Sequence, residues 1–545
     1  MYLPFTTGMH TTVAFFGLAI VSFSAALLLY LKFFYVDFPE VKGIPEIPGG
    51  SLLTGHLPQL GNDHATTAAS WSAKYEWPVF QFRMGRRRAI MINSFESARE
   101  WLVKNQSATI DRPWFYTFHG VISKTSAATI GTSPWNERTK KQRRVVGSFT
   151  TGPAMNKMHR MLHMETCAVV SRIYYDSLKG AVDIMPHVYQ KRLSLNLMMM
   201  LCYGTRFNSV QDPMLLQILE DAKTIASFRS TNSNPQDFIP HLRYLGTNQR
   251  TVTATEVRNR RDNWLATMFS NIQKRPNRLR PGDKKCVAEM LLEDNHEGLT
   301  KLDIKTILGG LMSGGFETIY STVIVTLRAL STPRGQEIQN KAYADMIGAY
   351  GSYENAFEQF LLEEKSHYVS SLVREALRFY PPHKILPARQ VYKDFTYVGA
   401  TIPQGMLIYI NNQAVNFDKE TYGPDAHEFR PERWIEAGCD IPPPYHFAYG
   451  AGARMCTAVN FANRMLYGVF VRLILSFKIT ESKEMPPNVH YIDYKEDSTA
   501  SNAIPSLFKL RFTPRDPGML EECLKNAHEN LTDFVTGDNA EPLFL

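Results

Sequence analysis

Cysteine is scarce in this sequence. The chain has six cysteines in 545 residues, and no two of them form a C-x-x-C pair: they are Cys167, Cys202, Cys286, Cys439, Cys456 and Cys523. Zinc sites and disulfide frameworks need regularly spaced cysteines, so this scatter argues against both. It favours a reducing compartment for the main part of the chain, and each cysteine has to be judged by its own surroundings.

A long basic tract and a flexible linker are also missing. The net charge is +8, but no Lys/Arg run is interleaved with aromatic residues, which argues against nucleic acid and favours an acidic partner or a membrane surface. No Gly/Ser-rich or charge-rich segment divides the chain after residue 50, and a hydrophobic content of 44% suits a sizeable core. We therefore expect one large domain at 51–515, although length alone would allow about three domains.

Charge is absent from residues 11–31, a stretch that is long enough, at roughly 20 residues, to span a bilayer. No small-residue cleavage site lies before Asp37, which favours a retained anchor over a removed signal peptide. We predict a membrane anchor with a single transmembrane helix in residues 1–36 and a proline-rich hinge at 37–50. The polar, acidic residues 516–545 are predicted to form a surface tail.

Cys456 ends a glycine-rich loop, Phe447-Ala-Tyr-Gly-Ala-Gly-Ala-Arg-Met-Cys-Thr-Ala458, and a helix-like run follows it. A helix N-terminus stabilises a thiolate, the form of cysteine that binds metal. Gly450 and Gly452 would let the backbone turn and approach a flat cofactor, and Arg454 could reach an anion at the cofactor's edge. We interpret Cys456 as a single axial ligand. The alternative is a free buried cysteine after a turn.

A second glycine pair lies within a long apolar pattern that predicts a helix over 302–330. Gly314 and Gly315 each cost about 1 kcal/mol relative to alanine in a helix interior, which suggests that something approaches the backbone there. Glu317 and Thr318 follow, a carboxylate and a hydroxyl suited to passing protons inward. The alternative is a helix crossing at the glycines, with the threonine bonded to its own turn.

The cysteine loop resembles the haem-binding loop of the cytochrome P-450 family, Phe-Gly-x-Gly-x-Arg-x-Cys-x-Gly. It departs from that pattern at Tyr449 and Ala458. Residues 314–318 match the family's Gly-Gly-x-Glu-Thr oxygen-activation motif at every position. The resemblance covers residues 40–515 and implies a mainly α fold with small β-sheets around haem b, whose iron would bind the Cys456 thiolate.

The resemblance also implies residues that surround the haem. The family usually has Trp-x-x-x-Arg, with both residues on a haem propionate; here Trp135 is present, Thr139 stands at the Arg position and Lys140 is next to it. Arg389 resembles a second propionate-binding arginine. A buried ionic triad that fixes the haem-side core would consist of Glu375, Arg378 and Arg433.

For the reaction, the resemblance implies monooxygenation with O2. NADPH electrons would arrive through the flavins of a separate NADPH-cytochrome P-450 reductase, with cytochrome b5 as a further possible donor. The thiolate would favour O–O cleavage, and Thr318, with Glu317 behind it, would help to deliver protons. The aromatic segment 111–133 would cap the substrate pocket, and Lys141, Arg143 and Arg144 are candidates for attracting the acidic donor protein. The expected location is the endoplasmic reticulum membrane, with the catalytic domain in the cytosol.

The cysteine loop and the residues after it resemble fungal family members that hydroxylate phenylacetate and small phenols such as m-cresol. We therefore predict hydroxylation of a ring or methyl carbon of a small aromatic substrate, in a fungal secondary-metabolite pathway like that of patulin. The alternatives are hydroxylation of a terpenoid or polyketide, a haem-thiolate isomerase or dehydratase, and a non-catalytic haem sensor or membrane scaffold.

Overall fold

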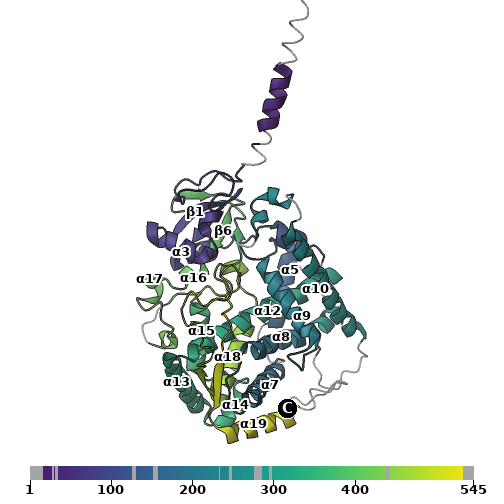
Figure 1. Ribbon diagram of the computed structural model, residues 1–545, viewed down its shortest axis with the longest axis vertical. Coiled ribbons are helices and arrows are strands. Elements are labelled where there is room, and N and C mark those ends of the chain that lie inside the picture. The colour runs from purple at the N-terminus through teal and green to yellow at the C-terminus, as the bar shows by residue number, and fades with distance from the viewer. Residues whose placement is uncertain are drawn as a thin grey trace, which may run out of the picture.

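A computed structural model describes residues 16–27, 30, 35–125, 130–150, 158–231, 234–244, 248–274, 285–293, 298–436 and 441–531. Figure 1 shows a broad helical body, a small sheet region near one end, and a helix over residues 16–27 that projects beyond that end. The mainly helical fold with small sheets is the one predicted.

Helices make up most of the body. The longer ones are α3 (His64–Tyr75), α5 (Glu137–Thr150), α7 (His159–Asp176), α8 (His187–Tyr203), α9 (Pro213–Ser227), α10 (Gln249–Lys274), α12 (Lys301–Leu330), α13 (Pro333–Tyr350), α15 (His367–Phe379), α18 (Val459–Ser476) and α19 (Pro517–Leu531). The short α-helices are α2 (Leu57–Leu60), α4 (Phe95–Arg99), α11 (Val287–Glu293), α14 (Tyr353–Gln359), α16 (Asn412–Val415) and α17 (Lys419–Tyr422). Short 3-10 and π-helical segments are η1 (Glu100–Lys104), η2 (Tyr116–Ile122), η3 (Pro235–Asp237), η4 (Pro240–Arg243), η5 (Pro431–Trp434) and η6 (Gly452–Arg454).

The largest sheet has the strand order β1-β2-β6-β3. Its strands are β1 (Val79–Met84), β2 (Arg87–Ile92), β6 (Leu407–Ile410) and β3 (Arg389–Gln390). β1 and β2 form an antiparallel hairpin, and β2 then pairs parallel with β6. Two further antiparallel pairs are β4 (Phe395–Tyr397) with β5 (Ala400–Ile402), and β7 (Phe477–Glu481) with β8 (Leu510–Pro514).

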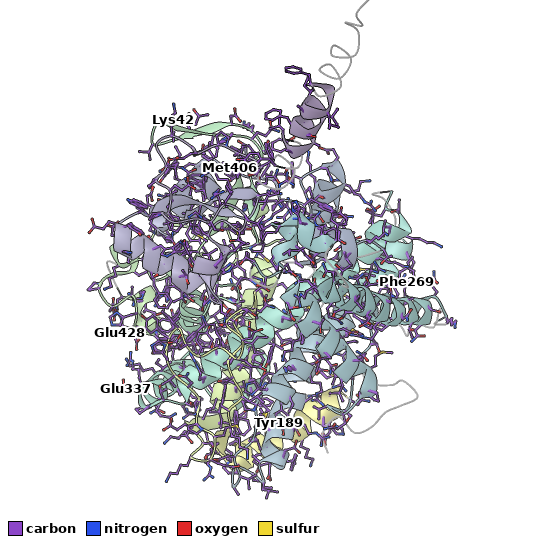
Figure 2. The ribbon with its side chains drawn as sticks, turned by 45° about the horizontal axis from the view of Figure 1, so that its top comes forward. Lys42, Tyr189, Phe269, Glu337, Met406 and Glu428 are labelled. Carbon is purple, nitrogen blue, oxygen red and sulfur yellow. The ribbon has the colours of Figure 1, made fainter. Side chains whose placement is uncertain are left out.

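Helix α12 runs through the middle of the body, where it packs against α8 and α18. Its start is fixed by a capping box, in which Thr300 Oγ1 accepts from the Asp303 N–H and the Asp303 carboxylate accepts from the Thr300 N–H. Nearly all of its C-terminal half is buried, including the polar residues Thr322, Thr326 and Arg328. Figure 2 shows how densely side chains fill the body around it, with the buried Met406 in the sheet region.

The expected surface tail is wrong for residues 517–531, which form α19. Leu520, Leu524 and Ala527 are buried in the main core at helical spacing, and Cys523 is buried beside them. The polar composition of this segment describes its outer face only, because an amphipathic helix needs few apolar residues to dock. The rest of the expected tail lies outside the described residues.

Much of the predicted anchor lies outside the described residues. Residues 16–27 are helical, and their side chains, including Phe16, Leu18 and Phe23, are exposed. Within the part of the chain that the structure describes, no helix has both the length and the apolarity needed to cross a bilayer.

Candidate functional site

The loop from Phe447 to Ala458 presents Cys456 at the start of α18. The Cys456 N–H donates to the Tyr449 carbonyl over 3.0 Å, which closes the loop, and the Ala458 N–H lies 3.4 Å from Sγ. Of the five cysteines that the structure describes, Cys456 is the exposed one. The loop therefore holds a sulfur that is open to a ligand and supported by a backbone N–H.

The two loop glycines serve different purposes. Both have positive φ, +67° at Gly450 and +63° at Gly452, which favours glycine. A Cβ on Gly452 would lie 1.8 Å from the Leu102 carbonyl oxygen, whereas one on Gly450 would meet nothing within 4 Å. We expected both glycines to admit a flat cofactor; at Gly452 the close neighbour is the backbone of η1 instead.

Four arginines gather beside this loop: Arg112, Arg143, Arg389 and Arg454. Burial and then the repulsion of the other guanidinium groups lower the pKa of Arg112, and the same causes lower the pKa of Arg389 to about 9. Asp111 is the carboxylate whose charge acts against this repulsion. A buried group of this composition has excess positive charge and would be stabilised by an anion.

Each arginine is also anchored to the backbone. Arg389 donates to the carbonyls of Thr109 and Ala451 at 3.1 and 2.8 Å, and Arg143 donates to that of Met455 at 2.7 Å. Even so, the buried Nε atoms of Arg112 and Arg454 have no hydrogen-bond partner within the described part of the chain. Rigid placement with donors to spare is what an anion site requires.

Trp135 and Lys140 lie differently with respect to this cluster. The Trp135 ring lies under Arg454, whose Cζ is 5.6 Å from the ring centroid, and the backbone N–H of Trp135 donates to Asp111 Oδ1. Lys140 lies on the exposed face of α5, 3.7 Å from Glu137, and is not part of the cluster. Arg143, which we assigned to the donor-protein surface, is in the cluster instead.

On α12 the two neighbouring glycines differ as the loop glycines do. A Cβ on Gly315 would lie 2.1 Å from the Met198 sulfur, so this glycine allows α8 to pack closely. A Cβ on Gly314 would meet nothing within 4 Å. The Thr318 hydroxyl donates to the Gly314 carbonyl over 2.6 Å. The alternative of a helix crossing at the glycines therefore holds for Gly315, and the expected bond of Thr318 to its own turn is present. Gly314, in contrast, faces open space.

Glu317 is a buried carboxyl group with one hydrogen bond, a donation from Asn502 Nδ2 to Oε2 over 2.6 Å. Burial raises its pKa to about 7, although the charge of Arg229, the Asn502 bond and the charge of Lys191 act in the opposite direction. A carboxyl group with a pKa near neutrality can both take up and release a proton. This property suits the proton-delivery role predicted for Glu317.

Two cavities lie near this part of the molecule, and the second of them borders α12. The first has about 950 Å³ of empty volume, part of it open to solvent, and is lined by residues that include Phe115, Phe118, Phe228, Arg229, His383 and Ile385. The second has about 660 Å³ and is lined by residues that include Ile122, Trp264, Arg229, Ser313, Phe316 and Glu317. Phe115, Phe118 and Ile122, which belong to the segment predicted to cap the substrate pocket, line these cavities. Sequence reasoning missed Arg229, which belongs to no motif.

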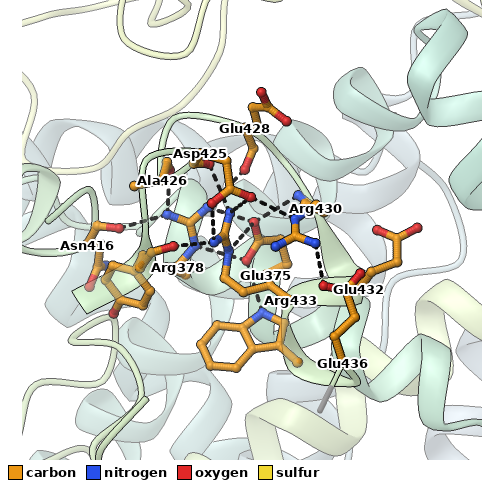
Figure 3. A network of polar contacts seen from close by, with 12 residues as sticks. Glu375, Arg378, Asn416, Asp425, Ala426, Glu428, Arg430, Glu432, Arg433 and Glu436 are labelled. Atoms are coloured by element: carbon orange, nitrogen blue, oxygen red, sulfur yellow. Dashed lines mark hydrogen bonds and ion pairs between the residues drawn. The ribbon is translucent and has the colours of Figure 1, made fainter. Parts of the chain in front are cut away.

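Figure 3 shows the Glu375–Arg378–Arg433 triad. Arg378 donates to both Glu375 oxygens, at 2.6 and 2.9 Å, and Arg433 Nε lies 3.8 Å from the same carboxylate. All three side chains are buried. Arg378 also donates to backbone carbonyls of the 416–428 segment, Glu375 accepts from the Arg430 N–H and Trp434 Nε1, and Arg433 pairs with Asp425 at 2.9 Å. The structure thus brings together the three residues named from the sequence.

Comparison with known proteins matches this architecture to one family. The family model described as cytochrome P-450 matches residues 45–493. The chain is 37% identical to phenylacetate 2-hydroxylase of Emericella nidulans over 94% of this chain and 98% of that one. It is 33% identical to 3-hydroxyphenylacetate 6-hydroxylase of the same organism, over 92% and 96% of the two chains. A solved zebrafish cytochrome P-450 with progesterone superposes with a TM-score of 0.66 at 18% identity, covering 83% of this chain and 99% of that one.

The fold and the cysteine loop therefore define a haem-thiolate protein, as the family implies. The chain belongs to the cytochrome P-450 family and is a cytochrome P-450 monooxygenase.

The residues present fit a haem. Cys456 would supply the axial thiolate, and the arginine cluster, with its unpaired Nε atoms, would hold the two propionates. Gly314 and Gly450 border open space where the flat ring needs room. Arg112 and Arg143 join the residues named from sequence. Arg143 follows Thr139 by one helical turn and so shares its face of α5, a spacing that could have identified it.

Proposed function

We propose that this chain hydroxylates a ring or methyl carbon of a small aromatic substrate, with O2 and electrons from NADPH. The observation that carries the proposal is the aromatic lining of the first cavity, by Phe115, Phe118, Phe228 and Phe238. Phe118 also lines the second cavity, which Glu317 borders. Rings packed edge to face favour a flat apolar substrate over a flexible one. The two fungal relatives, named as hydroxylases of phenylacetate and 3-hydroxyphenylacetate, support the same class.

The haem, when bound through Cys456, supplies the activation of O2. The protein's own residues would do the rest. The phenylalanines orient the ring and exclude water, Glu317 holds a proton at Oε1 or Oε2, and the Thr318 hydroxyl lies one turn from Gly314 on the same helix. Asn502 keeps the carboxyl group of Glu317 in place through its 2.6 Å bond.

Electron supply and location are part of the proposal. We expect a separate NADPH-cytochrome P-450 reductase, with cytochrome b5 as an optional donor, to dock on the face that carries the exposed residues of α5, since family members generally depend on such a partner. The apolar helix over residues 16–27, with its exposed Phe16 and Phe23, would belong to the anchor in the endoplasmic reticulum membrane.

The test is turnover by the full-length protein with purified reductase on a panel of phenols, arylacetic acids and terpenes under isotopically labelled O2. The proposal predicts one labelled oxygen atom in a hydroxylated arene or benzylic product. Exclusive turnover of terpenes would favour the alternative substrate class. Product formation without labelled oxygen would indicate an isomerase or dehydratase and would overturn the proposal.

A further inference from the structure

Arg229 occupies a special place between the two cavities. Among the residues that the structure describes, only Phe118 and Arg229 line both of them. Arg229 follows α9 by two residues, and its guanidinium lies over the Phe118 ring, 5.3 Å from the centroid. A substrate that extends from one cavity toward the other would have to pass this pair.

The guanidinium of Arg229 has donors to spare. Its Nε is buried without a hydrogen-bond partner, and no acceptor within the described residues bonds to its other nitrogens. Arg250 provides a useful contrast nearby. It lies 4.1 Å from the Phe228 ring centroid, yet it donates to Ser227 and Asn234 and lines neither cavity. Stacking on an aromatic ring therefore does not by itself account for the free donors of Arg229.

Neighbouring carboxylates leave the charge of Arg229 poorly balanced. Glu317 is the carboxylate that acts on it, and burial keeps Glu317 partly protonated near neutrality. The two acids that line the first cavity are engaged elsewhere: Asp63 accepts from Lys495, and Asp237 accepts from Thr117. Arg229 is half-buried, with its Nε atom fully buried, and an underbalanced cation in such a place is costly; a bound anion would relieve that cost.

We propose that Arg229 binds the carboxylate of an arylacetic acid and thereby orients its ring toward the Gly314–Thr318 turn of α12. A guanidinium can donate two parallel bonds to one carboxylate, which fixes the direction of the acid as well as its position. Phe118, beneath the same guanidinium, would contact the ring. This assignment rests on the proposed hydroxylation of small aromatics and narrows it to aromatic acids.

The test compares an acid with a neutral molecule of similar shape, using the full-length haem-loaded protein. Phenylacetate and 2-phenylacetamide are titrated by calorimetry into the wild type, Arg229→Gln, Arg229→Lys and the matched control Arg250→Gln. We expect Arg229→Gln to bind phenylacetate about 10- to 100-fold more weakly and the amide about as well as the wild type does. Arg229→Lys should recover part of the loss, because it keeps the charge without the two-pronged geometry.

Equal affinity of wild type and Arg229→Gln for phenylacetate would overturn the assignment, and so would parallel losses for acid and amide. If Arg250→Gln weakens phenylacetate binding as much as Arg229→Gln does, the loss is a general effect of changing this segment, and the assignment to Arg229 is contradicted. The outcome is separable from that of the proposed function. If the protein hydroxylates neutral phenols and the Arg229→Gln variant binds phenylacetate as the wild type does, the hydroxylase proposal stands and the role of Arg229 falls. Selective, Arg229-dependent binding of phenylacetate without hydroxylation would leave the role of Arg229 standing without the reaction.

Discussion

Two Glu–Arg systems in the protein differ in how many of their polar groups have hydrogen-bond partners. Around Glu375, both carboxylate oxygens and the Arg378 guanidinium have several partners, as Figure 3 shows. In the cavity region and within the described part of the chain, the Glu317 carboxyl group has one hydrogen bond and the Arg229 guanidinium has none. Saturated buried charges hold a scaffold in one arrangement, whereas unsaturated ones are left for protons and ligands.

A substitution in the Glu375–Arg378–Arg433 triad should have the largest effect on stability. Glu375→Ala leaves Arg378 buried without its carboxylate and removes the 3.8 Å contact of Arg433, which keeps its ion pair with Asp425. We therefore expect a loss of roughly 3–5 kcal/mol in unfolding free energy. Thermal unfolding and the yield of haem-loaded protein measure it. Glu436→Ala is the control, because its pair with Arg430 is largely exposed and should contribute about 0–1 kcal/mol. Similar losses in both variants would contradict the scaffold role.

The glycines extend the comparison to the backbone. Gly452→Ala forces a Cβ against the Leu102 carbonyl at positive φ and should cost about 2–4 kcal/mol. Gly314→Ala meets no neighbour, and alanine suits a helix better, so stability should stay equal or rise by about 0.5–1 kcal/mol. Turnover should fall in Gly314→Ala, because the methyl group enters the open space beside Glu317. Melting curves and rates measured together check this; destabilisation by Gly314→Ala would be the contrary result.

Glu317 makes the cavity system sensitive to pH. Its pKa rises from 4.5 in the unfolded chain to about 7 in the folded one, so the folded state binds the extra proton between these values. Stability from this group is therefore fully present below about pH 4.5 and is lost as the pH rises through about 7. Relative to Glu317→Gln, which cannot titrate, the wild type should lose up to a few kcal/mol across that window. A constant difference in melting temperature between the two proteins would contradict the raised pKa.

Thr318 should show the smallest change in stability. Thr318→Ala removes one local hydrogen bond to Gly314, which contributes about 0.5–1.5 kcal/mol at most. The expected effect is on coupling: less product for each NADPH consumed, because the hydroxyl no longer helps to deliver protons. Product and NADPH are quantified in the same reaction, and undiminished coupling would remove this role from Thr318.

The sequence predicted the contiguous parts of the site better than the assembled parts. Cys456 and the Gly314–Thr318 segment were identified from local spacing, and the triad was identified from motifs that resemble those of the family. Arg112 was missed because an anion site built from several segments leaves no local pattern, whereas Arg143 was assigned to the donor-protein surface although its spacing from Thr139 could have identified it. Like Arg112, Arg229 has no local pattern, because its importance arises from two cavities that meet only in the folded chain.

Helix α19 shows a different limit. Leu520, Leu524 and Ala527 repeat at helical spacing, so the signal was present in the sequence. We gave more weight to the polar composition of the segment than to this apolar spacing. Composition reflects the residues on the solvent-exposed face of the helix and does not reveal the face that packs against the core.

The central claim is that Cys456 holds haem iron as a thiolate, and the carbon monoxide difference spectrum of the reduced protein tests it most directly. We predict a thiolate-type spectrum for the wild type and its complete loss in Cys456→Ala, while Cys202→Ala, which changes a buried cysteine, retains it. A thiolate-type spectrum that persists in Cys456→Ala would place the iron on another residue and contradict the account.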